Sequence, residues 1–154
     1  MTTPTVVPAN FDGTDADFAK TKGVDRSGAA RIQAGTVTVP SGTAVNAYVG
    51  LIPFNKGARF NIHDKSVYFN NIGAGTTTAN LGVIYDDDST YTNDPDAFAS
   101  ANTAIQGGGF LTVDEKAGLT FEAEADGWLA VQILTAATDA EGDIEFNIVQ
   151  AYDG

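Results

Sequence analysis

The sequence predicts an all-β fold: an antiparallel two-sheet β-sandwich of the jelly-roll type, preceded by an extended N-terminal arm. From residue 32 onward, short runs rich in β-branched and aromatic residues alternate apolar and polar positions, as half-buried strands do. Gly, Pro, Asn and Asp separate these runs at the close spacing typical of sandwiches and barrels. The 154 residues suit one domain, and with no cysteine the fold depends on burial and backbone hydrogen bonds.

Residues 1–31 form the predicted arm, and residues 32–154 the predicted sandwich domain. The arm lacks sustained periodicity of either kind and carries Phe11 and Phe18 as isolated apolar anchors. The sequence leaves open whether it lies along its own domain, crosses to a neighbour, or is only a partly ordered terminus.

In the first half of the domain, each expected strand ends at a turn signal. Thr36–Val39 ends at Pro40-Ser41-Gly42, with Val37 and Val39 directed inward. The strand that follows is expected to stop at Pro53, and Asn55-Lys56-Gly57 makes the next turn. The expected strands of this half are 36–39, 45–52, 59–62, 66–72 and 80–85.

The second half contains one expected helix among strands. Asp94 as N-cap and Pro95 in the first turn predict a short helix over Asp94–Ala101. The alternation of Leu119, Phe121 and Ala123 with polar residues predicts a strand over Leu119–Glu124. The other expected strands are Phe110–Val113, Trp128–Thr135 and a closing strand with Ile144, Phe146, Ile148 and Tyr152 inward.

The charge distribution excludes some partners and suggests others. A net charge of −12 argues against nucleic acid, whose binders need clustered Lys and Arg. Seven of the eight cations precede residue 66, so the acidic second half suits a basic partner or self-association, although a solvated acidic face is the commoner explanation. The N-terminus is not a secretory signal and no run is long enough to span a membrane. We therefore expect synthesis in a cytoplasm, and no membrane partner.

No residue pattern predicts catalysis or a cofactor. His63, the only histidine, is followed by Asp64, but there is neither a Gly-x-Ser-x-Gly motif nor a second histidine, so a turn residue is the better interpretation. Glu122 and Glu124 share a strand face, which more simply indicates solvation than a glycosidase pair. The glycine-rich turns lack the Gly-Lys-Ser/Thr ending of a phosphate loop.

The acidic stretch around Asp86, Asp88 and Asp94 is the one weak candidate for a metal site. Carboxylates are ligands that calcium prefers, but the spacing does not match an EF-hand loop. A solvated loop is the better interpretation, and we expect no bound metal. Trp128, Tyr48, Tyr68, Tyr85 and Tyr91 could stack on a sugar, although aromatic residues in strands more often lie in a core or an interface.

Several features taken in order resemble small structural proteins of tailed-bacteriophage virions. They are a Thr-rich first strand (34–39), a Pro-Phe-Asn-Lys-Gly-Ala turn (53–58), a Leu-Gly-Val-Ile-Tyr-Asp strand (81–86), an Asp/Ala/Ser segment (94–104) and a C-terminal hairpin. The pattern covers about residues 32–152 and is most similar to capsid decoration, or cement, proteins with a jelly-roll fold. The resemblance implies a protein without chemistry that binds the outer surface of a capsid, commonly as a trimer.

The first hypothesis is therefore a decoration protein that binds the major capsid protein as a homotrimer and resides on the virion surface. Its best candidates for contact with the shell are in the arm, namely Phe11, Phe18, Lys20 and Lys22. The alternatives are a phage tail or head-fibre component and a carbohydrate-binding β-sandwich module.

Overall fold

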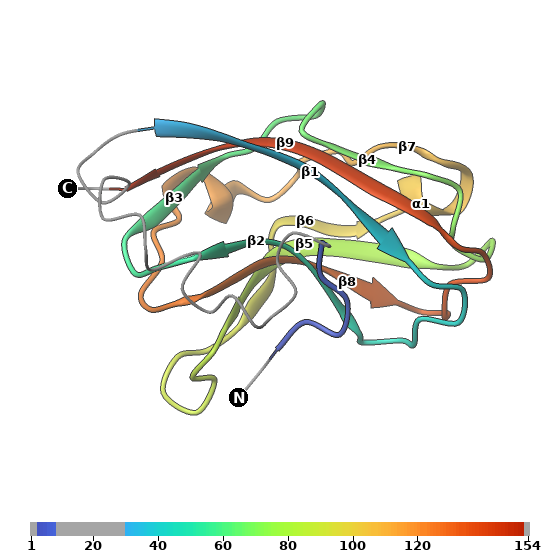
Figure 1. The fold of residues 1–154 in the computed structure, drawn as a ribbon, viewed down its shortest axis with the longest axis horizontal. Coiled ribbons are helices and arrows are strands. Elements are labelled where there is room, and N and C mark those ends of the chain that lie inside the picture. The colour runs from blue at the N-terminus through green and yellow to red at the C-terminus, as the bar shows by residue number, and fades with distance from the viewer. Residues whose placement is uncertain (1–2, 9–29, 153–154) are drawn as a thin grey trace.

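The computed structural model, which describes residues 3–8 and 30–152, contains two antiparallel sheets packed face to face (Figure 1). The five-stranded sheet has the order β1-β9-β4-β7, with β3 also paired to β9. The four-stranded sheet has the order β2-β8-β5-β6. The expected all-β sandwich is thus confirmed. Strand bounds in the five-stranded sheet are β1 (Ala30–Val39), β3 (Ala58–Asn61), β4 (Val67–Phe69), β7 (Gly109–Phe110) and β9 (Gly142–Tyr152). Those in the four-stranded sheet are β2 (Tyr48–Phe54), β5 (Thr78–Tyr85), β6 (Asp94–Asn102) and β8 (Gly127–Leu134).

Strand β9 organises the five-stranded sheet. Along one edge it pairs with β1 over the whole length of β1, from Ala30 opposite Ala151 to Val39 opposite Gly142. Along its other edge lie β4, which pairs near the start of β9, and β3, which pairs near its end. β3 and β4 therefore follow one another beside the same strand, with residues 62–66 as the interruption.

The core lies between the sheets and follows the period-two pattern. Val37 and Val39 of β1 are fully buried, as the alternation predicts. The expected inward side of the closing strand is also confirmed, because these four side chains are all buried: Ile144, Phe146, Ile148 and Tyr152. Phe54, Phe60, Phe98 and Phe121 form an aromatic cluster with ring centroids 5.6–6.4 Å apart. Such ring pairs stabilise a core beyond the area that they bury.

The first described residues lie along the edge of the four-stranded sheet. The Thr5 amide donates to the Tyr48 carbonyl at 2.8 Å, and the Gly50 amide donates to the Val6 carbonyl at 2.7 Å. A Cβ built on Gly50 would lie 2.8 Å from both Pro4 and Trp128, so glycine makes room for both rings here. This piece of the expected arm thus lies along its own domain, covering the edge of β2.

The helix expected over Asp94–Ala101 is wrong, because these residues belong to β6 and pair with β5. Local signals favoured a helix, but sheet pairing and burial of Ala97, Phe98 and Ala99 outweigh them. Pro95 is tolerated because it lies near the start of β6, an edge strand, where the lack of a backbone N–H costs little. In the described residues the only α-helix is the single turn α1 (Ala104–Gly107).

The strand expected over Leu119–Glu124 is also wrong. The chain forms a 3₁₀ helix, η2 (Lys116–Thr120), and continues without regular structure. Leu119 is 83% exposed instead of inward, while Ala123 is buried and exchanges backbone bonds with Gly57 and Ala58. Alternation alone did not reveal that η2 packs against β6, where a Cβ on Gly118 would lie 2.5 Å from Phe98.

The expected C-terminal hairpin of 128–135 with 143–152 is wrong as well, because β8 lies in the four-stranded sheet and β9 in the five-stranded sheet. Other differences are shifts of strand ends. β2 begins at Tyr48 and continues through Pro53 to Phe54, which an edge strand permits. β7 ends at Phe110, and β4 covers only Val67–Phe69.

Candidate interaction surface

The outer face of the five-stranded sheet carries a short apolar strip, formed by Ile32 of β1 and Val149 of β9. Register places Ile32 of β1 opposite Val149 of β9, and Val149 opposite Asn61 of β3. Since paired residues point to the same side of a sheet, these side chains share the outer face. Ile32 is 69% exposed and Val149 is partly exposed. The strip is therefore an apolar surface that the described part of the chain leaves accessible.

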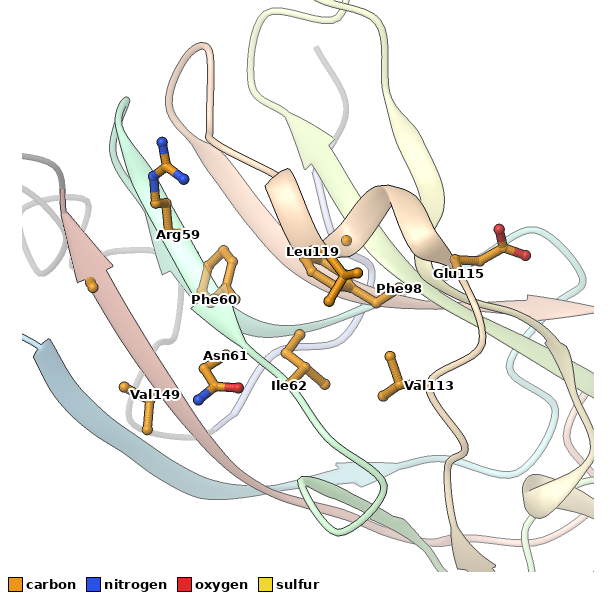
Figure 2. Close-up of a pocket in the computed structure, with 11 residues that line it drawn as sticks. Arg59, Phe60, Asn61, Ile62, Phe98, Val113, Glu115, Leu119 and Val149 are labelled. Carbon is orange, nitrogen blue, oxygen red and sulfur yellow. The ribbon is translucent and has the colours of Figure 1, made fainter.

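The strip continues into a groove at the edge of β3, which we call the β3 groove. Its volume is about 310 Å³. Figure 2 shows Ile62, Val113 and Leu119 gathered between β3 and η2, with Arg59 and Glu115 on opposite sides. The groove is lined by Arg59, Phe60, Asn61, Ile62, Phe98, Val113, Glu115, Gly118, Leu119, Val149 and Ala151.

One acidic side chain, that of Glu115, lines the β3 groove and also affects the pKa of a carboxyl group on β6. Burial, the hydrogen bond and charge of Asp96, and the charge of Glu115 together raise the pKa of Asp94 above its ordinary value. The three carboxylates are therefore close enough to interact. On the opposite side of the groove Arg59 bonds Glu122 at 2.6 Å, in an ion pair with both side chains more than 40% exposed. The β3 groove is therefore largely apolar, with one cation, Arg59, and one carboxylate, Glu115, among its lining residues.

A second hollow lies farther along the same face, beside β4 and β7. Tyr68 and Phe110 meet edge to face with centroids 5.1 Å apart, and Phe110 is 51% exposed. The cavity of about 280 Å³ is lined by Lys65, Ser66, Tyr68, Phe110, Glu145, Phe146 and Asn147. Sequence reasoning named Tyr68 as a possible stacking residue but missed Phe110, which gave no signal of its exposure.

The His63–Asp64 pair stabilises a turn. The His63 Nδ1 accepts a hydrogen bond from the Lys65 amide at 3.2 Å, and Asp64 accepts one from the Val113 amide at 3.0 Å. Both side chains thus accept hydrogen bonds from backbone amides, His63 from Lys65 and Asp64 from Val113. The geometry is that of a turn and gives no proton relay.

The candidate metal ligands belong to the β5–β6 connection and the start of β6. Asp87, between Asp86 and Asp88, accepts bonds from Ser89 and Thr90, and these bonds lower its pKa. Within residues 3–8 and 30–152, no three acidic or histidine side chains come together as ligands of one ion. The structure thus does not bring Asp86, Asp88 and Asp94 together as a site. Glu122 and Glu124 do not share a strand face, since the strand expected there is absent.

The arm residues predicted to make contacts, Phe11, Phe18, Lys20 and Lys22, lie outside the described residues. Their role, and the division of the chain at residue 32, stay predictions. None of the helices in the described residues is long and apolar enough to cross a membrane.

Comparisons with known proteins show where this fold recurs. A chain in the structure "Capsid of Ralstonia phage GP4" superposes with a TM-score of 0.62 at 16% identity, covering 90% of this chain and 96% of that one. A chain in the structure "Cyanophage Pam1 capsid asymmetric unit" superposes with a TM-score of 0.56 at 16% identity, covering 82% and 87%. No family model and no curated protein matches the sequence. At this identity the likeness establishes a shared fold.

Proposed function

We propose that this protein is a structural component of a phage virion that binds the outer surface of the capsid and stabilises the shell as a decoration protein. The observation that carries the proposal is the fold likeness to chains from two phage capsid structures, which extends over 96% of one of them. Because the match covers nearly the whole of that chain, the shared fold extends over the complete sandwich and is not limited to a few strands.

The strand order supports the jelly-roll form of the sandwich. If β3 and β4 are counted as one interrupted strand, eight strands remain, four in each sheet. The chain alternates between the sheets from β1 to β5 and again from β6 to β9, as two interlocked Greek keys require. Jelly rolls are common in viral capsids, so topology and fold likeness point to the same class.

The role is one of binding without catalysis. Among the residues that the structure describes, His63 and the acidic side chains act as hydrogen-bond partners of turns or as surface charges. What the surface offers is an apolar strip and two hollows on one face of one sheet. The partner we propose is the major capsid protein, contacted in part by Phe11, Phe18, Lys20 and Lys22 of the arm.

Co-sedimentation with purified shells of the phage that encodes the chain tests this proposal. We expect the protein to pellet with shells and to stay in solution without them. The double variant Lys20→Glu/Lys22→Glu should bind less, whereas Lys56→Glu, a reversal at an exposed turn of the domain, should bind as the parent does. Absence of the protein from the pellet would overturn the assignment to the capsid surface and favour a tail or head-fibre part.

We also propose that the protein is a homotrimer, because symmetric association covers exposed sheet edges and apolar strips. Sedimentation equilibrium should give a mass three times the 16.0 kDa of one chain. A monomer at micromolar concentration would contradict the homotrimer and leave the proposed capsid binding untouched.

A carbohydrate-binding module is the second candidate, favoured by the hollow beside Tyr68 and Phe110. An exposed ring above polar side chains is an arrangement that stacks on sugars. A glycan array distinguishes the candidates: binding that Phe110→Ala abolishes supports the module, and no binding leaves the virion role.

A further inference from the structure

Strand β1 forms an open edge of the five-stranded sheet. It pairs with β9 along its whole length, without a shift of register, and no backbone of another described segment bonds to it. Figure 1 shows β1 running beside β9. The strand has ten residues, so the edge is about 33 Å long at the usual rise of a strand. An edge of this kind presents a row of backbone N–H and C=O groups to a further strand.

The bonds of β9 show which backbone groups of β1 point to this open edge. The Asp143 amide of β9 donates to the Asn70 Oδ1, and the Asp143 carbonyl accepts from the Asn70 amide, both at 3.0 Å. Asp143 therefore directs both groups away from β1, and Thr38, which lies opposite to it, directs its own away from β9. Because bonded and non-bonded pairs alternate, every second residue of β1 points both backbone groups outward. These residues are Ala30, Ile32, Ala34, Thr36 and Thr38, and all five are exposed.

The other long edges are closed within the described part of the chain. β2 is covered by residues 3–8, which bond to its backbone. β6 carries Pro95, and its Phe98 carbonyl accepts the amides of Asp114 and Glu115 at 3.2 Å. β7, at the opposite end of the sheet from β1, has only two residues. Proline, a covering segment and a short strand are usual protections against strand addition, and among the described residues β1 has none of them.

The groups on the β1 edge determine which kind of partner it can take. Alternating N–H and C=O groups are matched by an extended peptide backbone, which offers the same groups at the same spacing. On the outer face, an added strand meets Ile32 at one end of β1 and Thr36 and Thr38 at the other. Beyond Thr36 and Thr38 lie Glu145 and Asp143, the two charged residues of β9. An apolar side chain suits the first end, and a lysine or arginine suits the second.

We propose that an extended segment of the major capsid protein adds to β1 as a further strand of the five-stranded sheet. It bonds to the outward N–H and C=O groups of residues 30–38, so that main-chain bonds hold the protein on the shell. The inference rests on the proposed function, from which it takes the partner, and it adds the site and the mode of contact. Because the outward groups are already aligned in β1, the sandwich itself need not change.

A proline at the centre of β1 tests this contact in the co-sedimentation assay with shells. Ala34→Pro removes one outward N–H and places a ring carbon where the added strand must approach. The bonds between β1 and β9 remain, because Ala34 is one of the residues that point outward. The matched control is Ala34→Ser, which changes the side chain and keeps the N–H. We expect the serine variant to bind shells as the parent does, and the proline variant to bind about tenfold or more weakly.

Thermal unfolding checks that both variants are folded. Each should melt close to the parent, since edge strands tolerate proline. If the proline variant unfolds early, the exchange measurement that follows decides, because it uses the parent protein.

Hydrogen exchange gives this second measurement. In the free protein the amides of the five outward residues should exchange rapidly, whereas those of Gln33, Gly35 and Val37, which point toward β9, should exchange slowly. On shells the outward amides should slow at least about tenfold, because the added strand accepts their hydrogen bonds. Exchange is stopped, the protein is released from the shells, and NMR shows which amides have kept their hydrogen.

The outcomes separate this inference from the proposed function. If the parent binds shells but the two folded Ala34 variants bind equally well, capsid binding stands and strand addition to β1 is wrong. The same holds if the outward amides exchange equally fast on and off shells. If the parent does not bind shells, both proposals are wrong. Slow exchange of the outward amides in the free protein would mean that the edge is already occupied, which would also overturn the inference.

Discussion

The outer faces of the two sheets differ in how much of their surface the chain itself covers. In the four-stranded sheet, Ile84 points outward from β5 yet is only 1% exposed, and Ala130 beside it on β8 is also buried. In the five-stranded sheet, Ile32 points outward from β1 and is 69% exposed. Two isoleucines that both point outward from a sheet thus differ in environment: Ile84 is buried and Ile32 is exposed to solvent.

The outer face of the four-stranded sheet is covered by segments that lie next to it, namely the start of β6 and residues near the N-terminus. Backbone atoms of Asp94 and Pro95 lie directly over Gly82, where a Cβ would come within 2.2 Å. Pro4 lies over Gly50 beside Trp128. On the same face the Gln132 side chain donates a hydrogen bond to the Tyr48 hydroxyl and accepts one from the Asn80 side chain. The outer face of the four-stranded sheet is thus covered by the chain itself, whereas that of the five-stranded sheet has accessible apolar side chains in the described residues.

Replacing the two isoleucines by alanine should give the largest contrast. Ile84→Ala removes a buried side chain and should lower the free energy of unfolding by about 2–5 kcal/mol. Ile32→Ala, the matched control, should change it by less than about 0.5 kcal/mol. Urea unfolding followed by Trp128 fluorescence measures both. Similar losses for the two variants would mean that the face of β1 is covered in solution.

Adding one methyl group at Gly82 should cause the second largest loss in the free energy of unfolding. Gly82→Ala places a Cβ against the backbone of Asp94 and Pro95, which cannot move aside without disturbing β6, so we expect a loss of about 1–3 kcal/mol. Gly75→Ala is the control, because nothing lies within 4 Å of its Cβ position. Thermal unfolding of both proteins checks this, and an unchanged melting temperature for Gly82→Ala would contradict the close packing.

Removing residues 1–7 should have a smaller effect on stability and a clear spectroscopic one. The deletion loses the bonds of Thr5 and Val6 to β2, together worth about 1–2 kcal/mol. It also uncovers Trp128, the only tryptophan, whose emission should move to longer wavelength. Pro4→Ala keeps the backbone bonds and should shift the emission with little loss of stability. An unchanged spectrum in both would mean that Pro4 does not cover the ring in solution.

The smallest effect on stability should come from Asp94, at the start of β6. The pKa of Asp94 is raised above its ordinary 3.8 in the folded state, chiefly by burial and then by Asp96. The folded state therefore binds the proton more tightly, and stability falls as the pH rises from below 3.8 through the raised pKa.

Asp94→Asn should thus stabilise the protein near neutral pH, by well under about 1 kcal/mol because the group is largely exposed, and the gain should vanish below about pH 3. Unfolding at both pH values measures it, with Asp139→Asn as a control far along the chain. A gain that persists at the lower pH would contradict the assigned cause.

The sequence was sufficient where burial alone decides the structure. In β9 the apolar residues Ile144, Phe146 and Ile148 alternate with polar ones, and in β1 Val37 and Val39 do the same, so period two predicted which face of each strand is buried. The period-two pattern failed where the structure of a segment depends on residues far away in the sequence. β6 looks helical locally and becomes a strand only because β5 supplies a partner, and Leu119 alternates correctly but lies on a 3₁₀ turn.

The surface was harder to predict than the core. Neither the β3 groove nor the Tyr68–Phe110 hollow has a sequence signature, because each joins segments that only the strand order brings together. The arm residues were singled out by composition alone, and their role is still to be tested.

The position of β9 in the chain determines the order in which this protein can assemble. β1, β3 and β4 all take their hydrogen bonds from a strand that begins at residue 142, more than a hundred residues after β1 begins. During synthesis on a ribosome, β1 is therefore made long before the strand with which it pairs. Contacts so far apart in sequence slow folding. A fragment that ends before residue 142 would lose the strand that holds β1, β3 and β4 together, and with it one side of the core between the two sheets.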